Sequence, residues 1–230
     1  MTTVGAIIVG AGRGERMGGQ GGDKVFAFLD GRPLLAYSVA TFAASRVVQF
    51  IVVVLHERNL ERGRALVQER RWRKVVAVCA GGERRQDSVR AGLGALPPCD
   101  LVVVHDAARP LITTDLIRRG VEVATATGAA AIAAMPVKDT IKRVDDGGRV
   151  VETPPRERLW AAQTPQVAHR AALERAFALA DRRGLTVTDE AALLEAAGEP
   201  VSVFAGSYHN LKITTPEDLA IAAALLVAGS

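Results

Sequence analysis

Short apolar runs rich in β-branched residues recur along the chain, and segments with helical periodicity separate them. The runs cover residues 4–9, 47–55, 75–78, 101–105, 129–135 and 200–204. Strands that alternate with helices are typical of βαβ units, in which helices cover both faces of a parallel sheet. The pattern therefore predicts an α/β fold with a mostly parallel central sheet flanked by helices, as one domain over residues 1–230.

Two segments add detail to this pattern. The stretch TPEDLAIAAALLVAG carries clear helix signals, with Thr215 as N-cap, Pro216 at the first helical position and Gly229 after the end. Residues 138–160 instead alternate as two short strands around a DDGG turn. We therefore expect a hairpin arm outside the main sheet, at about residues 137–160.

Composition and charge limit the partners and the cellular compartment that we expect for this chain. The net charge of +4 comes partly from an Arg-rich helix face at residues 69–74, which only Trp72 interrupts. Because no nucleic-acid motif accompanies it, we interpret it as a solvated face and expect no nucleic-acid partner. The chain has no run of eighteen apolar residues and no secretory signal pattern, so we expect a cytoplasmic protein without a membrane partner. Cys79 and Cys99 lack metal-binding spacing and are expected to be thiols.

A glycine-rich loop follows the first predicted strand, with seven glycines between Gly10 and Lys24. The backbone amides of such a loop can approach a phosphate at the carboxyl ends of parallel strands, where ligands bind. A dinucleotide fingerprint is excluded because Glu15 replaces its third glycine, and a Walker loop is excluded because Asp23 and Val25 flank Lys24. Two interpretations remain, a loop that wraps a triphosphate and a flexible surface loop with solvated charges.

Six motifs together resemble one family, with AAQTPQV and TDEA counted as one. The pattern G-x-G-x-R-M followed by a lysine resembles the signature loop of nucleotidyltransferases. The later stretches GGERRQDSVRAGL, VHDAARP, AAQTPQV with TDEA, and NLKITTPEDL narrow the match, as does PVKDTIK. In order and spacing over nearly the whole chain they resemble the 2-C-methyl-D-erythritol 4-phosphate cytidylyltransferases of the non-mevalonate isoprenoid pathway. The resemblance implies a single Rossmann-like nucleotidyltransferase domain whose hairpin is a dimerisation arm.

The resemblance also implies a reaction: transfer of a cytidylyl group from CTP to the polyol phosphate, with release of pyrophosphate. Two polyanions must meet, so Mg²⁺ or another divalent cation and fixed cationic side chains are needed to offset repulsion. By resemblance, Arg16 and Lys24 hold the triphosphate and Lys212 is a second cation at the α-phosphorus. From the residues alone, an ordinary structural role for Lys212 stays equally open.

Nucleotide recognition is expected at two glycine-rich places. Gly81 and Gly82, with Ser88 on the next helix, suit a close-fitting pocket for a pyrimidine, although turn and cap roles explain them as well. The resemblance favours nucleotide binding over turn and cap roles for these residues. It places the nucleotide against Gly10, Ala11, Gly12, Gly14, Gly82 and Ser88.

Asp106 follows a predicted strand, so it is expected at the carboxyl edge of the sheet. A carboxylate there suits Mg²⁺ held mainly through triphosphate oxygens, or a substrate hydroxyl, while an N-cap role stays open. His105 is interpreted as a structural histidine, because the attacking phosphate is already an anion. By resemblance the acceptor is bound by Asp106, Arg109, Thr140, Arg156, Thr164 and Thr188. Of these, Thr140 and Arg156 would reach the partner's site from the arm of a homodimer.

Some residues depart from the family pattern. Asp23 and Val25 flank Lys24 where the family usually has proline and often glutamine, and residues 207–209 replace an acidic position. Three alternatives therefore stay open. They are a cytidylyltransferase for another polyol phosphate such as ribitol 5-phosphate, a guanylyltransferase of the molybdenum-cofactor type, and a nucleotide-binding regulatory module without turnover.

Overall fold

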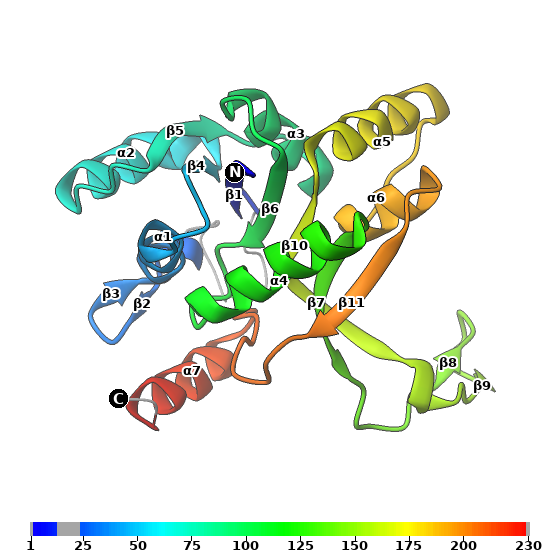
Figure 1. Ribbon diagram of the computed structural model, residues 1–230. Coiled ribbons are helices and arrows are strands. Elements are labelled where there is room, and N and C mark those ends of the chain that lie inside the picture. Colours follow the sequence, from blue (N-terminus) through cyan, green and yellow to red (C-terminus); the bar gives the residue numbers. More distant parts are fainter. Residues whose placement is uncertain (1, 13–23, 229–230) are drawn as a thin grey trace.

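A central sheet of seven strands organises the computed structural model, which describes residues 2–12 and 24–228 (Figure 1). The strand order is β11-β7-β10-β6-β1-β4-β5. The bounds are β1 Val4–Gly10, β4 Phe50–Leu55, β5 Val75–Ala80, β6 Leu101–Asp106, β7 Ala130–Pro136, β10 Trp160–His169 and β11 Val201–Ala205. All neighbouring strands are parallel except β10, which is antiparallel to β6 and β7. The predicted mostly parallel α/β fold is confirmed.

Strand β10 was not predicted. Its sequence WAAQTPQVAH has few β-branched residues and contains Pro165, which argues against a central strand because proline cannot donate to the ladder. In the structure, an irregularity in the pairing of β10 with β7 accommodates the proline. The register of β10 against β7 shifts between Ala162 and Gln166, so Pro165 lies outside the regular pairing.

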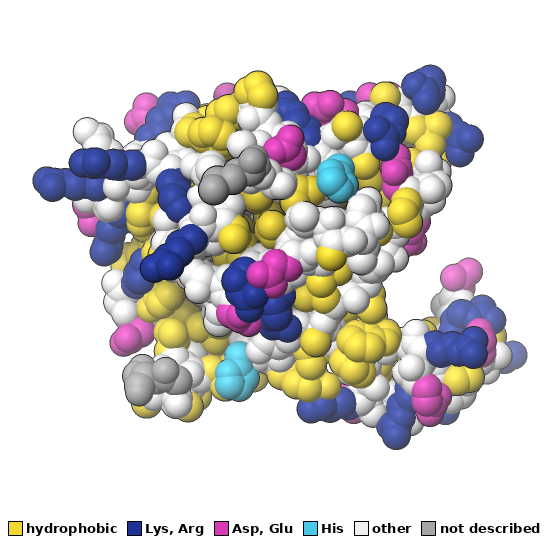
Figure 2. All heavy atoms as spheres, in the orientation of Figure 1, with side chains coloured by type: hydrophobic (Ala, Val, Ile, Leu, Met, Phe, Trp, Pro, Cys, Tyr) yellow, Lys and Arg dark blue, Asp and Glu magenta, His cyan; other side chains and the backbone are white. Residues whose placement is uncertain are grey.

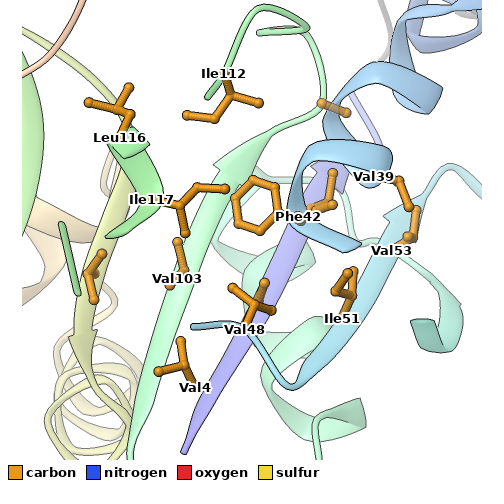
Figure 3. Close-up of a cluster of buried hydrophobic side chains, with 14 of the residues drawn as sticks. Val4, Val39, Phe42, Val48, Ile51, Val53, Val103, Ile112, Leu116 and Ile117 are labelled. Atoms are coloured by element: carbon orange, nitrogen blue, oxygen red, sulfur yellow. The ribbon is translucent and has the colours of Figure 1, made fainter. Parts of the chain in front are cut away.

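Helices cover both faces of the sheet. One face packs against α1 (Leu34–Ala44), α2 (Leu60–Glu69) and α4 (Thr114–Thr127), and the other against α3 (Arg85–Ala95), α5 (Arg170–Arg183) and α6 (Glu190–Ala196). Because side chains alternate along a strand, Ile51 and Val53 of β4 join the first cluster while Val52 and Val54 join the second. Figure 3 shows Phe42 of α1 at the centre of the first cluster.

The last helix, α7 (Pro216–Ala228), begins where the sequence predicts. The Asp218 amide donates to Thr215 Oγ1 at 3.4 Å, and the Asp218 carboxylate accepts from the Thr215 amide at 2.9 Å. Gly229 lies outside the described residues. The predicted Arg-rich helix face at residues 69–74 is wrong, because α2 ends at Glu69 and Arg71 has a φ of 53°. Within residues 2–12 and 24–228 no helix is long and apolar enough to cross a membrane.

The predicted hairpin is confirmed as an antiparallel pair, β8 (Arg143–Val144) and β9 (Val150–Glu152), joined by the DDGG turn. Asp145 Oδ1 accepts from the amides of Gly147 and Arg149 at 3.0 and 2.9 Å, and Gly148 takes the positive φ of 78° that the turn needs. The hairpin projects from the ends of β7 and β10 and stands clear of the body in the space-filling view (Figures 1 and 2).

The topology creates a crevice beside β1. From β1 the chain continues to β4 and β5 on one side, and β6 then pairs with the other side of β1. Strands from different parts of the chain thus flank β1, and the carboxyl edge of the sheet at such a point is where open α/β sheets bind ligands. Asp106, the last residue of β6, lies at this edge as predicted.

Candidate active site

A pocket of about 500 Å³ opens at this crevice, within the size range of small-molecule sites. It is lined by the end of β1, the residue Lys24, the loop before α3, the end of β6 and the segment before α7. The predicted site residues that line it are Gly10, Ala11, Gly12, Lys24, Gly82, Ser88, Asp106 and Lys212. Arg16 and Gly14 lie outside the described residues.

Asp106 contacts two cations in the pocket wall. Lys212 Nζ lies 2.7 Å from Asp106 Oδ2, and Arg85 Nε lies 3.2 Å from Asp106 Oδ1. Burial alone would raise the pKa of Asp106, but the charges of Arg85 and Lys212 outweigh burial and hold that pKa well below its usual range. Asp106 is therefore an ionised carboxylate at neutral pH, and its contacts favour an electrostatic role over an N-cap.

Arg85 and Glu190 are site residues that the sequence analysis missed. Arg85 Nη1 lies 2.7 Å from Glu190 Oε1 and Arg85 Nη2 lies 3.0 Å from Glu190 Oε2, a bidentate pair in which Arg85 lines the pocket and Glu190 lies behind it. Burial alone would lower the pKa of Arg85, but Glu190 and Asp106 raise it above its usual value. Both residues stand inside motifs quoted above, GGERRQDS and TDEA, and their opposite charges were the available signal.

His105 and Thr164 form a buried network behind Asp106. His105 Nε2 faces the Arg109 carbonyl oxygen at 3.2 Å, and a carbonyl only accepts, so Nε2 carries the proton. His105 Nδ1 then accepts from Thr164 Oγ1 at 3.0 Å, while Thr164 Oγ1 accepts from the Asp106 amide at 3.1 Å. Burial lowers the pKa of His105 to about 4, so the ring is neutral at pH 7. These contacts bear out the interpretation of His105 as structural.

Arg109 is also buried rather than open to the pocket. Its Nη1 donates to the Asn210 carbonyl oxygen at 2.7 Å, and burial lowers the pKa of its guanidinium. Asn210 Nδ2 in turn donates to the Thr164 carbonyl oxygen at 2.7 Å. Arg109 thus ties the loop after β6 to the segment that carries Lys212.

Ser88 shapes the glycine turn beside the pocket. Its hydroxyl accepts from the Gly82 amide and donates to the Arg84 carbonyl oxygen, each at 3.2 Å. Gly81 is required by close packing, because a Cβ there would lie 2.4 Å from Ala11 Cβ and 2.5 Å from Ser88 Oγ. A contact between Ser88 and a cytosine base stays a prediction.

The remaining predicted acceptor residues do not line this chain's pocket. Thr164 is buried in the network described above, and Thr188 is exposed next to α6. Thr140 and Arg156 are exposed at the base of the arm, where Arg156 Nη1 donates to the Lys138 carbonyl oxygen at 2.7 Å. The structure therefore brings Lys24, Asp106 and Lys212 together, while acceptor contacts of the other residues stay predictions.

The pocket offers few protein ligands for a metal ion. Among the described residues, no cluster of three or more His, Cys, Asp or Glu side chains could hold a metal. Two acidic residues, Glu83 and Asp106, line the pocket. Because Mg²⁺ binds through one or two carboxylates plus substrate phosphates and water, this donor set fits an ion held mainly by the triphosphate.

Known proteins resemble the chain over nearly its whole length. Residues 4–228 match the sequence model of 2-C-methyl-D-erythritol 4-phosphate cytidylyltransferase. A protein of that name from Dehalococcoides mccartyi is 47% identical over 226 residues, covering 98% of this chain and 97% of the relative. One from Alkaliphilus metalliredigens is 43% identical over 222 residues, covering 96% of this chain and 91% of the relative.

Solved structures agree with these matches. The crystal structure of 2-C-methyl-D-erythritol 4-phosphate cytidylyltransferase from Thermus thermophilus has a TM-score of 0.79 at 32% identity, covering 99% of this chain and 100% of the other. The 4-diphosphocytidyl-2C-methyl-D-erythritol synthase from Anaerococcus prevotii has a TM-score of 0.85 at 29% identity, covering 98% and 96%. Motifs, fold and pocket thus agree with the matches, and the chain belongs to the 2-C-methyl-D-erythritol 4-phosphate cytidylyltransferase family.

Proposed function

We propose that this chain transfers the cytidylyl group of CTP to 2-C-methyl-D-erythritol 4-phosphate, giving 4-diphosphocytidyl-2-C-methyl-D-erythritol and pyrophosphate. The observation that carries the proposal is a pocket at the carboxyl edge of the sheet that both Lys24 and Lys212 line, with Lys212 Nζ held 2.7 Å from Asp106 Oδ2. Membership of the family supplies the identity of the two substrates.

The reaction depends on neutralisation of phosphate charge more than on proton transfer. An oxygen of the acceptor phosphate attacks the α-phosphorus of CTP, and the bond from that phosphorus to the oxygen of the departing pyrophosphate breaks. The attacking oxygen is already anionic near neutral pH, so no general base is required. Lys24 and Lys212 would neutralise the triphosphate and the charge that develops at the α-phosphorus in the transition state. By family resemblance Arg16 adds a third cation.

The same pocket fits a divalent cation, and we propose Mg²⁺. Asp106 would hold it as a single protein carboxylate, with triphosphate oxygens as the main ligands. When bound, the ion supplies further neutralisation of the phosphate charge.

We further propose that the arm completes the site of a second subunit in a homodimer. Several large apolar side chains of the arm are exposed, with Val150 at 58%. The set comprises Ile141, Val144, Val150, Val151 and Trp160. Exposed apolar surface of this kind marks interaction sites. Thr140 and Arg156 lie outside the pocket of their own chain, and a guanidinium suits bidentate capture of a phosphate from the partner side.

Pyrophosphate release with four nucleoside triphosphates and several acceptor phosphates tests the proposal. We expect turnover with CTP and 2-C-methyl-D-erythritol 4-phosphate to exceed that of every other pair. Equal or faster turnover with GTP would support a guanylyltransferase, and preference for ribitol 5-phosphate would support another cytidylyltransferase. Binding of CTP without pyrophosphate release from any acceptor would support a regulatory module.

A further inference from the structure

A chain of four charged groups crosses the pocket wall in the order Glu190, Arg85, Asp106, Lys212. We propose that Arg85 and Glu190 are a positioning pair for Lys212. Glu190 holds the guanidinium of Arg85, Arg85 holds one oxygen of Asp106, and the other oxygen anchors the Lys212 ammonium at one place in the pocket. This inference rests on the proposed function and assigns roles to two residues that it does not use.

The geometry of Arg85 explains why it acts through Asp106. Each of its three nitrogens contacts a protein carboxylate: Nε contacts Asp106 Oδ1 at 3.2 Å, while Nη1 and Nη2 contact the two oxygens of Glu190 at 2.7 and 3.0 Å. A fork held at three points has a fixed plane. Arg85 lines the pocket, and three of its five N–H groups are directed at Asp106 and Glu190.

Glu190 is itself held by the central sheet. It is the first residue of α6, whose N-cap Asp189 accepts from the Ala192 amide at 3.0 Å. The other oxygen of Asp189 accepts from Gln166 Nε2 at 2.9 Å, and Gln166 Oε1 accepts from the Ala191 amide at 3.1 Å. Because Gln166 belongs to β10, beside β6, the start of α6 is tied to the strand that neighbours Asp106.

Lys212 is the group that needs positioning. Its side chain is 41% exposed and long, so its ammonium has many positions open to it unless a partner restrains it. Arg85 occupies Asp106 Oδ1 and leaves Oδ2 for Lys212. Stability alone does not account for the pair of Arg85 and Glu190, because apolar residues of similar volume commonly replace a buried ion pair without loss of stability.

The test removes both partners together, in the double variant Arg85→Met/Glu190→Leu, so that no buried charge is left unpaired. We expect a melting temperature close to that of the wild type, a kcat for pyrophosphate release that falls roughly ten- to a hundredfold, and a KM for CTP within about threefold. A folded double variant with wild-type kcat overturns the proposal.

A double-mutant cycle with Asp106→Asn separates positioning from other roles. If Arg85 acts through Asp106, then the double substitution lowers kcat no further in the Asp106→Asn background. Losses that multiply would mean that Arg85 binds the triphosphate directly or only supports the fold, and they overturn the proposal. If the double variant does not fold, Glu190→Gln replaces it in the same cycle with the same expectations.

An ion pair between α3 and α5, outside the pocket, is the matched control. Arg90 Nη2 on α3 lies 2.6 Å from Asp181 Oδ1 on α5, with side chains 39% and 58% exposed and neither residue lining the pocket. The variant Arg90→Met/Asp181→Asn is expected to keep the wild-type kcat and KM. A loss equal to that of Arg85→Met/Glu190→Leu would show that any disturbance of α3 lowers turnover, which contradicts positioning.

A crystal structure of the Arg85→Met/Glu190→Leu variant keeps the test independent of turnover. We expect the Asp106 carboxylate to be rotated, or Lys212 Nζ to be distributed over both oxygens. An unchanged Asp106 with Lys212 Nζ still 2.7 Å from Oδ2 alone overturns the proposal. If the wild type itself releases no pyrophosphate from CTP with any acceptor, the proposed function fails, and this structure still decides for or against the pair.

Discussion

Removing the Lys212 ammonium is expected to slow turnover far more than it destabilises the fold. The Lys212 side chain is 41% exposed, whereas its partner Asp106 is buried, so the pair is only partly exposed and Lys212→Ala should cost about 1 kcal/mol of stability. Asp106 keeps Arg85 as a partner at 3.2 Å and is not left as an unpaired buried charge. The melting temperature therefore changes little.

The effect on turnover has a different origin. A fixed cation directed at developing phosphate charge is worth roughly 3–4 kcal/mol in the transition state, which corresponds to a loss of kcat of about a hundredfold or more. Initial rates of pyrophosphate release at saturating CTP measure this loss, and Lys212→Arg, which keeps the charge, serves as the control. A Lys212→Ala protein that folds normally and turns over at a near-normal rate would refute the assigned role.

Three further predictions address other parts of the molecule. Chains carrying Lys24→Ala and chains carrying Arg156→Ala should each be inactive as separate proteins. After the two are mixed and exchange subunits, up to about a quarter of wild-type activity should return, because one site in each heterodimer has neither defect. A mixture that stays inactive despite demonstrated exchange contradicts the shared site. Gly81→Ala should weaken CTP binding and lower the melting temperature, because a Cβ there would lie 2.5 Å from Ser88 Oγ; calorimetry showing wild-type affinity would oppose this. The folded pKa of His105 is about 4, below its ordinary value of 6.5, so the unfolded chain binds more protons between these values. The stability that the neutral ring confers is therefore fully present above pH 6.5, and about 3 kcal/mol of it is lost as the pH falls towards 4. Urea titrations at several pH values measure the free energy of unfolding, and in His105→Gln this free energy should not show that fall with pH.

Sequence patterns predicted the fold where burial dominates a whole segment. β1, β4 and β6 are continuous apolar runs because helices cover both of their faces, and such runs are visible without a structure. β10 was missed because its position in the sheet depends on a register shift around Pro165, and no local propensity predicts that irregularity.

The site was predictable to the level of residue type and edge of the sheet. Asp106 was expected at the carboxyl end of a strand and lies there. The pairing of Arg85 with Glu190 joins positions 105 residues apart, so it depends on how α3 and α6 pack and not on any local pattern. Likewise, sequence identifies Thr164 as a hydroxyl near the site, whereas only the structure shows that its hydrogen bonds go to His105 and Asp106 inside the protein.

The most direct test of cytidylyl transfer is ³¹P nuclear magnetic resonance of the protein mixed with CTP, Mg²⁺ and 2-C-methyl-D-erythritol 4-phosphate. The proposal predicts that the triphosphate and monoester signals decline together, while a pair of coupled diphosphate-diester signals and free pyrophosphate appear in equal amounts. Formation of CDP and inorganic phosphate with the monoester signal unchanged, or no change in any signal with folded protein, would contradict it.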